Sequence, residues 1–563
     1  MKLLCILLLL IPLNPIHAAP ATIDPKAIET VDAYLKNAVK HDYSGSVLVA
    51  SHGKVLLSSG YGMADRTHGI PFRAGTIFDI GSLTKQFTAA AILKLQMQKK
   101  LSVQDAISKY LEGVPEDKKS ITIDQLLTHT AGFTDALGED EEWIGREDYL
   151  KLAFHSELQS PGKFSYSNVG YSILAAIVEK VSGQEYEHFL REYLFLPAGM
   201  KLTGYVLPQW KREDMAIGYR NGEEWGTTFD KSRYQNGVTW HLKGNGGIHS
   251  TLEDMYRWYV ALQGHAILSD EAKRAYFAPH VEDAPNVHYA YGWSVRQNSR
   301  GETVITHNGG NGYFMATVYM IPAQDFVIIA SSNNNPKNTD TIAARMDRML
   351  FERLPPLDEK FIATFSGDYD LPDGGTIHVT FDENDAAQAS MNDTQSWRLL
   401  SAGKDDDLQV AAGYDQKIRA MWSALKSGDI PKAAAALPST GPEKATQEFL
   451  GAMRDRMSKR KGEIRLVYVL GSVSRRGGSY YLTAVKITCE RGDLYQVYVW
   501  KDGRIQEVRP AEEANLKAFD HESGGTFYAE GNDLRITFRV DKDRPAAIIG
   551  DVTAYKHEDH EEK

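Results

Sequence analysis

Ser82 and Lys85 stand three positions apart at the predicted start of a helix, in the stretch DIGSLTKQFTAAA. A lysine three residues after a serine lies directly beneath it on a helix. Apolar residues cover much of the circumference of this helix, so most of it is predicted to be buried. Burial disfavours the charged form of a lysine, which can then accept the proton of a serine hydroxyl. The pair predicts a nucleophile with its activating amine.

The Ser-x-x-Lys spacing is weak by itself, because it recurs in the chain at Ser51/Lys54, Ser160/Lys163, Ser401/Lys404, Ser423/Lys426 and Ser458/Lys461. The alternative interpretation is that Ser82 only caps the helix and that Lys85 extends its charge to water. What distinguishes Ser82 is its place before a long apolar helix, ahead of two further polar motifs.

The second motif is Tyr166-x-Asn168, in a predicted loop after Pro161-Gly162 and before an apolar helix that starts at Tyr171. Rigid elements often hold catalytic side chains on such loops. A lysine ammonium stabilises a nearby phenolate, so Tyr166 is a candidate general base. The alternative is a capping turn with an aromatic anchor. The same spacing recurs at Tyr219/Asn221 and Tyr234/Asn236.

The third motif, His307-Asn308-Gly309, follows a strand-like run and occurs once in the chain. Its glycine and the following Gly310 allow a substrate to approach backbone N–H groups closely. Two such N–H groups, one of them from the start of the serine's helix, form an oxyanion hole. The alternative is a glycine- and asparagine-rich hairpin turn with an incidental histidine.

The elements that must position these motifs follow from hydrophobic periodicity. Residues 24–41 predict a helix, and a hairpin follows around His52-Gly53-Lys54. Helical patterns dominate from Ser82 to about Leu196, and strand patterns return in YAYGWSV, ETVITHNGG and ATVYMIPAQDFVIIASS. Strands on both sides of a helical segment predict one sheet whose edges come from distant sequence, flanked by helices and with a helical region beside it.

A last helix before Pro355-Pro356 ends this part of the chain, so we expect a domain at residues 24–354. Beyond the prolines, short strands predict a small, discontinuous β-domain, barrel-like, at 358–405 and 513–557. Between its halves, helical patterns over 411–461 and strand patterns over 463–509 predict an α+β insert at 408–512. The fold class is therefore α/β (α+β), followed by a β-domain with an insert.

The first 18 residues predict a signal peptide: Lys2, then an apolar run too short to span a bilayer, then a plausible cleavage site after Ala18. We therefore expect an exported protein, periplasmic or secreted, with no transmembrane segment once the leader is removed. Removal of Cys5 with the leader leaves Cys489 alone, so no internal disulfide is expected.

The net charge of −11 argues against nucleic acid and anionic membranes as partners. No histidine or cysteine spacing predicts a zinc site, and we expect neither a metal nor an organic cofactor. The C-terminal HEDHEEK is interpreted as a solvated end of the chain rather than a metal site. Oligomeric state is open.

The three motifs occur along the chain in the order Ser-x-x-Lys, Tyr-x-Asn, His-x-Gly. Together they resemble the superfamily of serine β-lactamases and penicillin-recognising hydrolases, in particular class C β-lactamases, penicillin-binding proteins, D-aminopeptidases and related esterases. The resemblance covers about residues 25–353 and implies a β-lactamase/transpeptidase-like fold. Further segments resemble the superfamily in its usual order: TIFDIGSLTKQFTAAAILKL, LSVQDAISKYL, ITIDQLLTHTAGF, FSYSNVGYSILAAIVEKVSG, GNGGIHSTLEDMYRW and HNGGNGYF.

The resemblance implies a role for each motif residue. Ser82 is the implied nucleophile that forms an acyl-enzyme, and Lys85 and Tyr166 together are implied to shuttle its proton. Asn168 is implied to bind the carbonyl region of an amide or ester substrate. The backbone N–H groups of Ser82 and Gly310 are the implied oxyanion hole.

His129 and the Gly244–Gly247 run also belong to the resemblance, and we interpret both as structural. The glycine run leads into a predicted capping box, Ser250-x-x-Glu253.

One departure concerns the third motif. Where β-lactamases and D-alanyl carboxypeptidases typically have Lys-Thr-Gly, this chain has His307-Asn308-Gly309. A permanent ammonium attracts a substrate carboxylate, whereas histidine is mostly neutral at pH 7. The departure therefore argues against efficient β-lactam hydrolysis, and His-x-Gly resembles D-aminopeptidase-like and penicillin-binding-protein-like members.

The prediction is an exported serine hydrolase that cleaves amide bonds of peptides containing D-amino acids. A carboxylesterase of the same fold is the alternative, because the pocket and not the nucleophile separates the two. A catalytically inactive binding or scaffold protein is the alternative of another class. The presence of Ser82, Lys85 and Tyr166 argues against it.

Overall fold

The computed structural model forms two compact units. The first comprises residues 1–282 and 287–351, and the second comprises residues 352–563 and 283–286. The predicted leader, Pro355-Pro356 and most of HEDHEEK lie outside the described residues. The structure describes residues 23–39, 43–220, 223–232, 237–284, 286–335, 339–352, 357, 359–372, 374–381, 386–391, 393–401, 408–437, 443–475, 480–501, 503–511, 516–523, 525–529 and 534–557.

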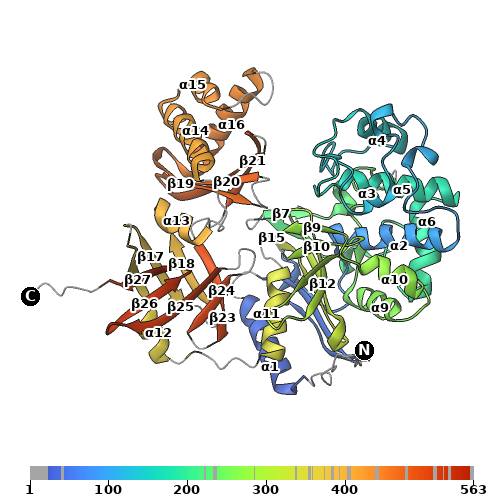
Figure 1. The fold of residues 1–563 in the computed structure, drawn as a ribbon, viewed down its shortest axis with the longest axis horizontal. Coiled ribbons are helices and arrows are strands. Elements are labelled where there is room, and N and C mark those ends of the chain that lie inside the picture. Colours follow the sequence, from blue (N-terminus) through green and yellow to red (C-terminus); the bar gives the residue numbers. More distant parts are fainter. Residues whose placement is uncertain are drawn as a thin grey trace, which may run out of the picture. The chain divides into compact units, whose positions relative to one another are not determined.

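An eight-stranded sheet forms the centre of the first unit, in the order β2-β1-β14-β13-β12-β11-β10-β9 (Figure 1). Its strands are β1 (Gly45–Ser51), β2 (Lys54–Tyr61), β9 (Val281–Ala284), β10 (Val287–Tyr289), β11 (Ser294–Gln297), β12 (Thr303–Gly310), β13 (Met315–Ile321) and β14 (Phe326–Ser332). The early strand β1 pairs antiparallel with the late strand β14, in a register that sets Gly45 against Ser332. The prediction of one sheet assembled from distant sequence is confirmed.

The predicted hairpin joins β1 to β2. His52 and Gly53 both have positive φ, 50° and 71°. A two-residue turn with positive φ at both positions matches the right-handed twist of the strands that it connects.

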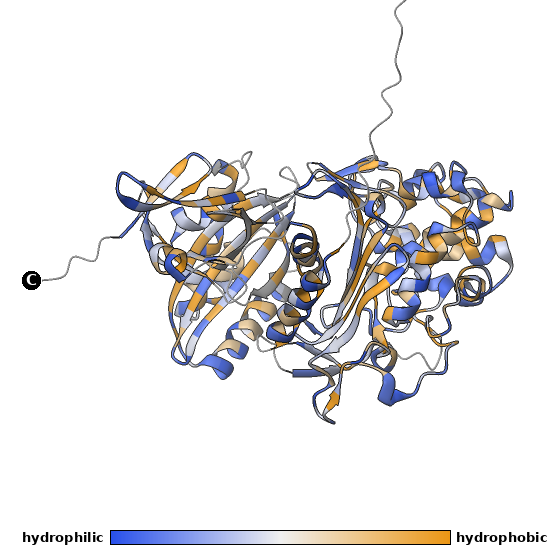
Figure 2. Ribbon diagram, turned by 90° about the horizontal axis from the view of Figure 1, so that it is seen from below, coloured by the Kyte–Doolittle hydropathy of each residue, from blue (hydrophilic) through white to orange (hydrophobic). Residues whose placement is uncertain are grey.

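Alternate residues of β1 enter different cores, one on each face of the sheet. Val47 and Val49 pack with helices α1 (Pro25–Ala38) and α11 (Thr339–Phe351). Leu48 and Ala50 belong to the larger core of the other face, where α9 (Leu252–Gln263) contacts β1 and β14. Side chains alternate across a strand, so a strand buried on both faces is apolar throughout. In Figure 2 the apolar residues of this unit accordingly gather on the strands and on the inner sides of the helices.

A helical region extends the larger core, with α2 at its centre. Its helices are α2 (Thr84–Met97), α3 (Ile123–Leu127), α4 (Arg146–His155), α5 (Asn168–Ser182), α6 (Tyr186–Leu190), α7 (Leu196–Ala198) and α10 (Asp270–Phe277). Helix α2 is buried from Thr84 to Leu93 and packs against α5 and α10. The predicted run of helices from Ser82 to Leu196 is confirmed.

Short elements complete the first unit. They are the pairs β3 (Met63–Asp65) with β4 (Ile70–Pro71) and β5 (Phe78–Asp79) with β8 (His249–Ser250), the sheet of β15 (Asn334–Asn335), β6 (Gly218–Arg220) and β7 (Glu223–Gly226), and helix α8 (Thr228–Lys231).

Two predicted helix starts are corrected. Helix α5 begins at Asn168 rather than at Tyr171, because the Ser167 side chain caps it by accepting from the N–H of Gly170. The predicted capping box Ser250-x-x-Glu253 is wrong by one residue. Ser250 lies in strand β8, so the cap of α9 is Thr251, whose side chain accepts from the N–H of Asp254.

The second unit contains a closed barrel. Its strands are β16 (Gly367–Asp370), β17 (Thr376–Phe381), β18 (Ala387–Met391), β23 (Leu516–Ser523), β24 (Thr526–Ala529), β25 (Leu534–Asp541), β26 (Arg544–Ile549) and β27 (Val552–Lys556). Helices α12 (Glu359–Phe365) and α13 (Thr394–Ser401) contact strands of the barrel. Aromatic rings such as Phe365, Phe527 and Phe538 belong to its core.

Between α13 and β23 the described residues form further helices and an antiparallel sheet. The elements are α14 (Leu408–Ser427), α15 (Ile430–Ala435), α16 (Glu443–Lys461), β19 (Ile464–Arg475), β20 (Tyr480–Cys489), β21 (Gly492–Lys501) and β22 (Arg504–Ala511). Cys489 is buried in the core of this part. The predicted fold class, with its β-barrel and its α+β insert, is confirmed, and the exact domain boundaries stay a prediction.

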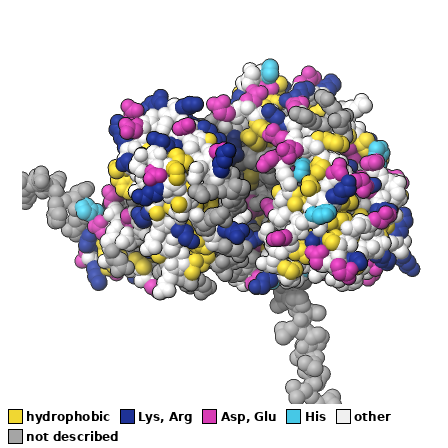
Figure 3. Space-filling view, turned by 90° about the horizontal axis from the view of Figure 1, so that it is seen from above, with side chains coloured by type: hydrophobic (Ala, Val, Ile, Leu, Met, Phe, Trp, Pro, Cys, Tyr) yellow, Lys and Arg dark blue, Asp and Glu magenta, His cyan; other side chains and the backbone are white. Residues whose placement is uncertain are grey.

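The surface carries both signs of charge. Figure 3 shows acidic and basic side chains interspersed over the face that it draws. In the part of the chain that the structure describes, no helix is both long enough and apolar enough to cross a membrane.

Candidate active site

Ser82 lies in a 3-10 turn, Gly81–Leu83, that leads directly into α2. Gly81 has a φ of +50°, a conformation that glycine adopts without steric cost. The Asp79 carboxylate accepts the N–H of Gly81 at 2.6 Å and so holds the turn. The serine is partly exposed at the end of a buried helix, as a nucleophile must be to meet a substrate.

The Lys85 side chain is fully buried and has three acceptors. Its Nζ donates to Ser82 Oγ at 3.0 Å, to Asn168 Oδ1 at 2.6 Å and to the backbone carbonyl of Asn245 at 2.9 Å. These contacts use all three donors of an ammonium group. The alternative in which Lys85 extends to water is therefore wrong.

Burial lowers the pKa of Lys85 to about 7, against the opposing charges of Asp135 and Asp140. Loss of solvation disfavours the ammonium form, which raises the share of neutral amine near neutral pH. A neutral amine at 3.0 Å from the hydroxyl of Ser82 is placed to take its proton.

Tyr166 faces Lys85 from the residue before the cap of α5. Lys85 Nζ lies 4.8 Å from the centroid of its ring. The ring packs at 4.3 Å against the imidazole of His129, whose Nδ1 accepts the N–H of Ser167 at 3.0 Å. His129 is buried and has a φ of +58°. Its contacts with Ser167 and Tyr166 stabilise the turn that carries Tyr166. These contacts agree with the interpretation of His129 as a structural residue.

Asn168 connects Lys85 to a carboxylate. Its Oδ1 accepts from Lys85, and its Nδ2 donates to Asp135 Oδ1 at 3.0 Å. These two partners fix which end of the amide faces the lysine, because a lysine only donates and an ionised carboxylate only accepts.

His307 lies on strand β12 itself, so its interpretation as part of a hairpin turn is wrong. Its Nδ1 lies 2.6 Å from the carbonyl of Asn308 and its Nε2 3.0 Å from the hydroxyl of Tyr289. A ring nitrogen that faces a carbonyl must carry the proton, so Nε2 accepts from Tyr289 in the neutral ring. Burial and the charge of Lys85 lower the pKa of His307 to about 3, so the neutral form prevails at pH 7.

The backbone of Gly309-Gly310 lies against the turn of Ser82. A Cβ placed on Gly309 would lie 2.0 Å from the carbonyl oxygen of Ile80 and 2.7 Å from the N of Ser82, and one on Gly81 would lie 2.5 Å from the N of Gly310. The two N–H groups of the predicted oxyanion hole are thus brought together by an approach that only glycine allows.

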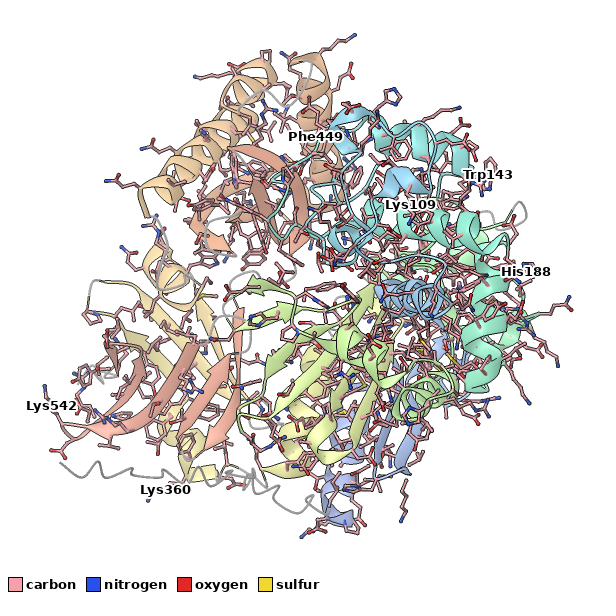
Figure 4. All side chains as sticks on the ribbon, turned by 45° about the vertical axis from the view of Figure 1, so that its right-hand side comes forward. Lys109, Trp143, His188, Lys360, Phe449 and Lys542 are labelled. Carbon is pink, nitrogen blue, oxygen red and sulfur yellow. The ribbon has the colours of Figure 1, made fainter. Side chains whose placement is uncertain are left out.

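The turn after β12 is held by Asp79, the same residue that holds the Gly81 turn. Asn311 Nδ2 donates to Asp79 Oδ2 at 3.1 Å, so Asp79 holds both the Gly81 turn and the turn after β12. Tyr313 in this turn stacks on Trp225 at 4.3 Å, and Trp225 Nε1 donates to Glu141 at 2.8 Å. The segment that contains Glu141 runs on to Trp143, a half-exposed side chain on the surface of the helical region (Figure 4).

The structure thus brings all of the predicted site residues together, from the turn that leads into α2 and α2 itself, from the segment around the start of α5 and from the end of β12. Sequence reasoning missed Asp135, Tyr289 and the carbonyl of Asn245. Asn245 belongs to the Gly244–Gly247 run, which was interpreted as structural, and Asp135 follows the segment ITIDQLLTHTAGF. Tyr289 lies in a segment with a strand pattern, and nothing in the sequence around it predicts a contact with His307.

Among the described residues, no group of three or more His, Cys, Asp or Glu side chains is arranged to hold a metal ion. The chemistry of the site as described is that of acyl transfer: a nucleophile, an amine base, a phenol and two converging N–H groups.

We expect Gly309→Ala to reduce acylation of Ser82 by about 100-fold or more, because the methyl group forces Gly309 away from the Ser82 turn and displaces one donor of the oxyanion hole. The rate of covalent labelling by a fluorescent fluorophosphonate measures the effect. Gly75→Ala is the matched control, since a Cβ there meets no atom within 4 Å. Equal labelling rates for the two variants would contradict the assigned close approach.

Comparison with known proteins shows which family the chain matches. The model of the family described as Beta-lactamase matches residues 31–351. Penicillin-binding protein 4* of Bacillus subtilis is 26% identical over 373 residues, which cover 61% of this chain and 82% of that protein. The putative penicillin-binding protein PbpX of the same organism is 31% identical over 316 residues, which cover 55% of this chain and 77% of that protein.

Solved structures share the fold. The octameric penicillin-binding protein homologue from Pyrococcus abyssi matches with a TM-score of 0.54 and 18% identity, over 95% of this chain and all of that one. FmtA from Staphylococcus aureus matches with a TM-score of 0.51 and 21% identity, over 60% of this chain and 92% of that one. With the three motifs in one site, these matches lead to one conclusion: the chain belongs to the Beta-lactamase family of serine hydrolases.

Proposed function

We propose that the protein is an exported hydrolase that forms an acyl-enzyme on Ser82 and cleaves amide bonds of peptides that contain D-amino acids. The observation that carries the proposal is the buried Lys85 amine, 3.0 Å from Ser82 Oγ. The leader-like first 18 residues support export, to the periplasm or out of the cell. The neutral third motif supports substrates other than β-lactams.

In the proposed first step, Ser82 Oγ attacks the substrate carbonyl carbon while neutral Lys85 takes the hydroxyl proton. The carbonyl oxygen becomes an oxyanion that accepts from the N–H groups of Ser82 and Gly310. Collapse of this intermediate breaks the C–N bond, and the leaving nitrogen receives the proton from the Lys85–Tyr166 pair.

In the proposed second step, water attacks the ester carbonyl of the acyl-enzyme. The pair of Lys85 and Tyr166 accepts a proton from this water and returns one to Ser82 Oγ as the acid leaves. Lys85 and Tyr166 are treated as one proton-transferring unit, because the ammonium lies against the phenol ring and each affects the proton of the other. Asn168 orients the substrate beside them.

Replacement of the nucleophile tests the acyl-enzyme. We expect Ser82→Ala to abolish covalent labelling by a fluorescent penicillin or fluorophosphonate, since the atom that forms the bond is gone. Ser423→Ala is the matched control: it removes an exposed serine of another Ser-x-x-Lys match and should label like the unaltered protein. Labelling that survives in Ser82→Ala would refute the assignment. A protein that forms no acyl-enzyme with β-lactams, esters or D-peptides would instead be a binding protein.

Turnover of matched substrates tests the amide preference against the esterase alternative. We expect hydrolysis of D-aminoacyl p-nitroanilides, because the Lys85–Tyr166 pair can protonate the poor nitrogen leaving group. The corresponding p-nitrophenyl esters, which need no such proton, should also react. Turnover of the esters alone would leave an esterase and contradict the peptidase assignment.

The pH dependence of acylation tests the role of Lys85. The pKa of Lys85 is lowered to about 7, so its neutral form is lost as pH falls through this value. Acylation should therefore rise with pH up to about 7 and then level off, with about a tenfold loss per unit below it. Because the pKa of His307 is lowered to about 3, its titration should not change the acylation rate near neutral pH. Labelling rates measured from pH 5 to 9 check this, and a flat profile would exclude Lys85 as the base.

A further inference from the structure

Asp79 is a buried carboxylate that contacts both turns from which the oxyanion hole is built. It lies at the end of β5, in register with His249 of β8, and only 1% of its surface is exposed. Its Oδ1 accepts the N–H of Gly81 at 2.6 Å. Its Oδ2 accepts Nδ2 of Asn311 at 3.1 Å and the hydroxyl of Thr228. The carboxylate therefore joins its own turn to two segments that are distant in the sequence.

The side-chain amide of Asn311 can take only one orientation in this arrangement. Its Oδ1 accepts the N–H groups of Tyr313 at 3.1 Å and of Phe314 at 2.9 Å. Its Nδ2 donates to Asp79 Oδ2 and, at 3.0 Å, to Thr228 Oγ1. A backbone N–H only donates and an ionised carboxylate only accepts, so the oxygen must face the turn and the nitrogen must face Asp79. We call Asp79, Thr228 and Asn311, each bound to the other two, the Asp79 clamp.

The Asp79 clamp holds the chain next to each donor of the oxyanion hole. Gly81 immediately precedes Ser82, and Asn311 immediately follows Gly310. A movement of one turn relative to the other would therefore shift the N–H of Ser82 or that of Gly310. Such donors stabilise an oxyanion only when they are fixed in advance at hydrogen-bonding distance from the same oxygen.

We propose that Asp79 is a positioning residue for catalysis: through the Asp79 clamp it sets the distance between the N–H groups of Ser82 and Gly310, and with it the stabilisation of the oxyanion. The proposal rests on the acyl-enzyme of the proposed function and goes beyond it. It does not depend on whether an amide or an ester is cleaved, because both pass through the same oxyanion. A carboxylate that served only the fold would change the free energy of unfolding and leave the acylation step unaltered.

Exchange of the two side chains across the clamp tests the proposal. In Asp79→Asn the new oxygen can still accept from Gly81, but the new nitrogen then faces the nitrogen of Asn311, donor against donor. In Asn311→Asp a second carboxylate lies about 3.1 Å from the first, and the two repel each other. Each single variant should lose about 10-fold or more of the maximal acylation rate, because it displaces a donor of the oxyanion hole.

The double variant Asp79→Asn/Asn311→Asp restores the contacts with their roles reversed. The amide at position 79 donates to the carboxylate at position 311, which can still accept from Thr228, Tyr313 and Phe314. The net charge equals that of the unaltered protein. We expect the double variant to acylate about 10-fold or more faster than either single variant, since contacting residues are coupled.

Labelling by a fluorescent fluorophosphonate, followed as a function of its concentration, separates the maximal rate from the half-saturating concentration. The clamp acts on the developing oxyanion, so the maximal rate should change while the half-saturating concentration changes by about threefold or less. Thr228→Val removes only the third member of the clamp and should cause a smaller loss of rate than Asp79→Asn.

Asp254→Asn is the matched control. Asp254 lies on α9, is also 1% exposed, and its Oδ2 likewise accepts a backbone N–H, from Leu202 at 2.7 Å, and a threonine hydroxyl, from Thr203 at 3.0 Å. This variant should lower the free energy of unfolding and leave the maximal rate of acylation unchanged.

A maximal rate in Asp79→Asn equal to that of the unaltered protein would overturn the proposal, and so would a double variant no faster than the single variants. Thermal unfolding followed by circular dichroism verifies that each variant is folded at the temperature of labelling. If Asp79→Asn does not fold, Asn311→Asp and the double variant supply the same comparison. Labelling that survives in Ser82→Ala overturns the proposed function instead.

Discussion

The burial of one amine is the constraint on which the rest of this active site depends. An ammonium group without water must find an acceptor for each of its protons, or its charge becomes costly. Lys85 has three acceptors, but all three are uncharged, and the charges of Asp135 and Asp140 only partly offset the loss of solvation, so its pKa is lowered to about 7. The incomplete compensation is what makes the group a base near neutral pH.

The supports of the site follow from this constraint. Asn168 must present its oxygen to the lysine, so its nitrogen needs an acceptor, which Asp135 provides. The carbonyl of Asn245 must point inward, and its side chain is held by Ser172 and the carbonyl of His241. On the other side, Asp79 fixes both the Gly81 turn and the Asn311 turn, and so sets the distance between the two N–H groups of the oxyanion hole.

Local patterns predicted the parts of the fold that depend on local physics. The apolar circumference of α2, the hairpin at His52-Gly53 and the alternation of the late strands are properties of short segments, and each was found where its pattern lies. The three motifs identified the reacting residues because each combines a reactive side chain with a helix start or glycines. The cap at Thr251 was missed by one residue, since the pairing of Ser250 with a distant strand decides where that helix begins.

The partners of the reacting residues could not be predicted in the same way. Asp135 meets Asn168 and Tyr289 meets His307 through the tertiary fold, and an aspartate or tyrosine in a polar segment has many other uses. Their importance follows from distances and burial alone. The change from lysine to histidine in the third motif was visible in the sequence, whereas the hydrogen bonds that keep this histidine uncharged were not.

The pairing of β1 with β14 has a consequence for how the protein reaches its active form. The residues of β1 are made early, yet their neighbour in the sheet is complete only at Ser332. Until then one edge of β1 lacks its partner, and an open strand edge invites association with other chains. Contacts of such large sequence separation slow folding, because a long loop must close before they form. The catalytic strand β12 lies within that loop, so the enzyme acquires its activity only after nearly the whole first unit has been synthesised.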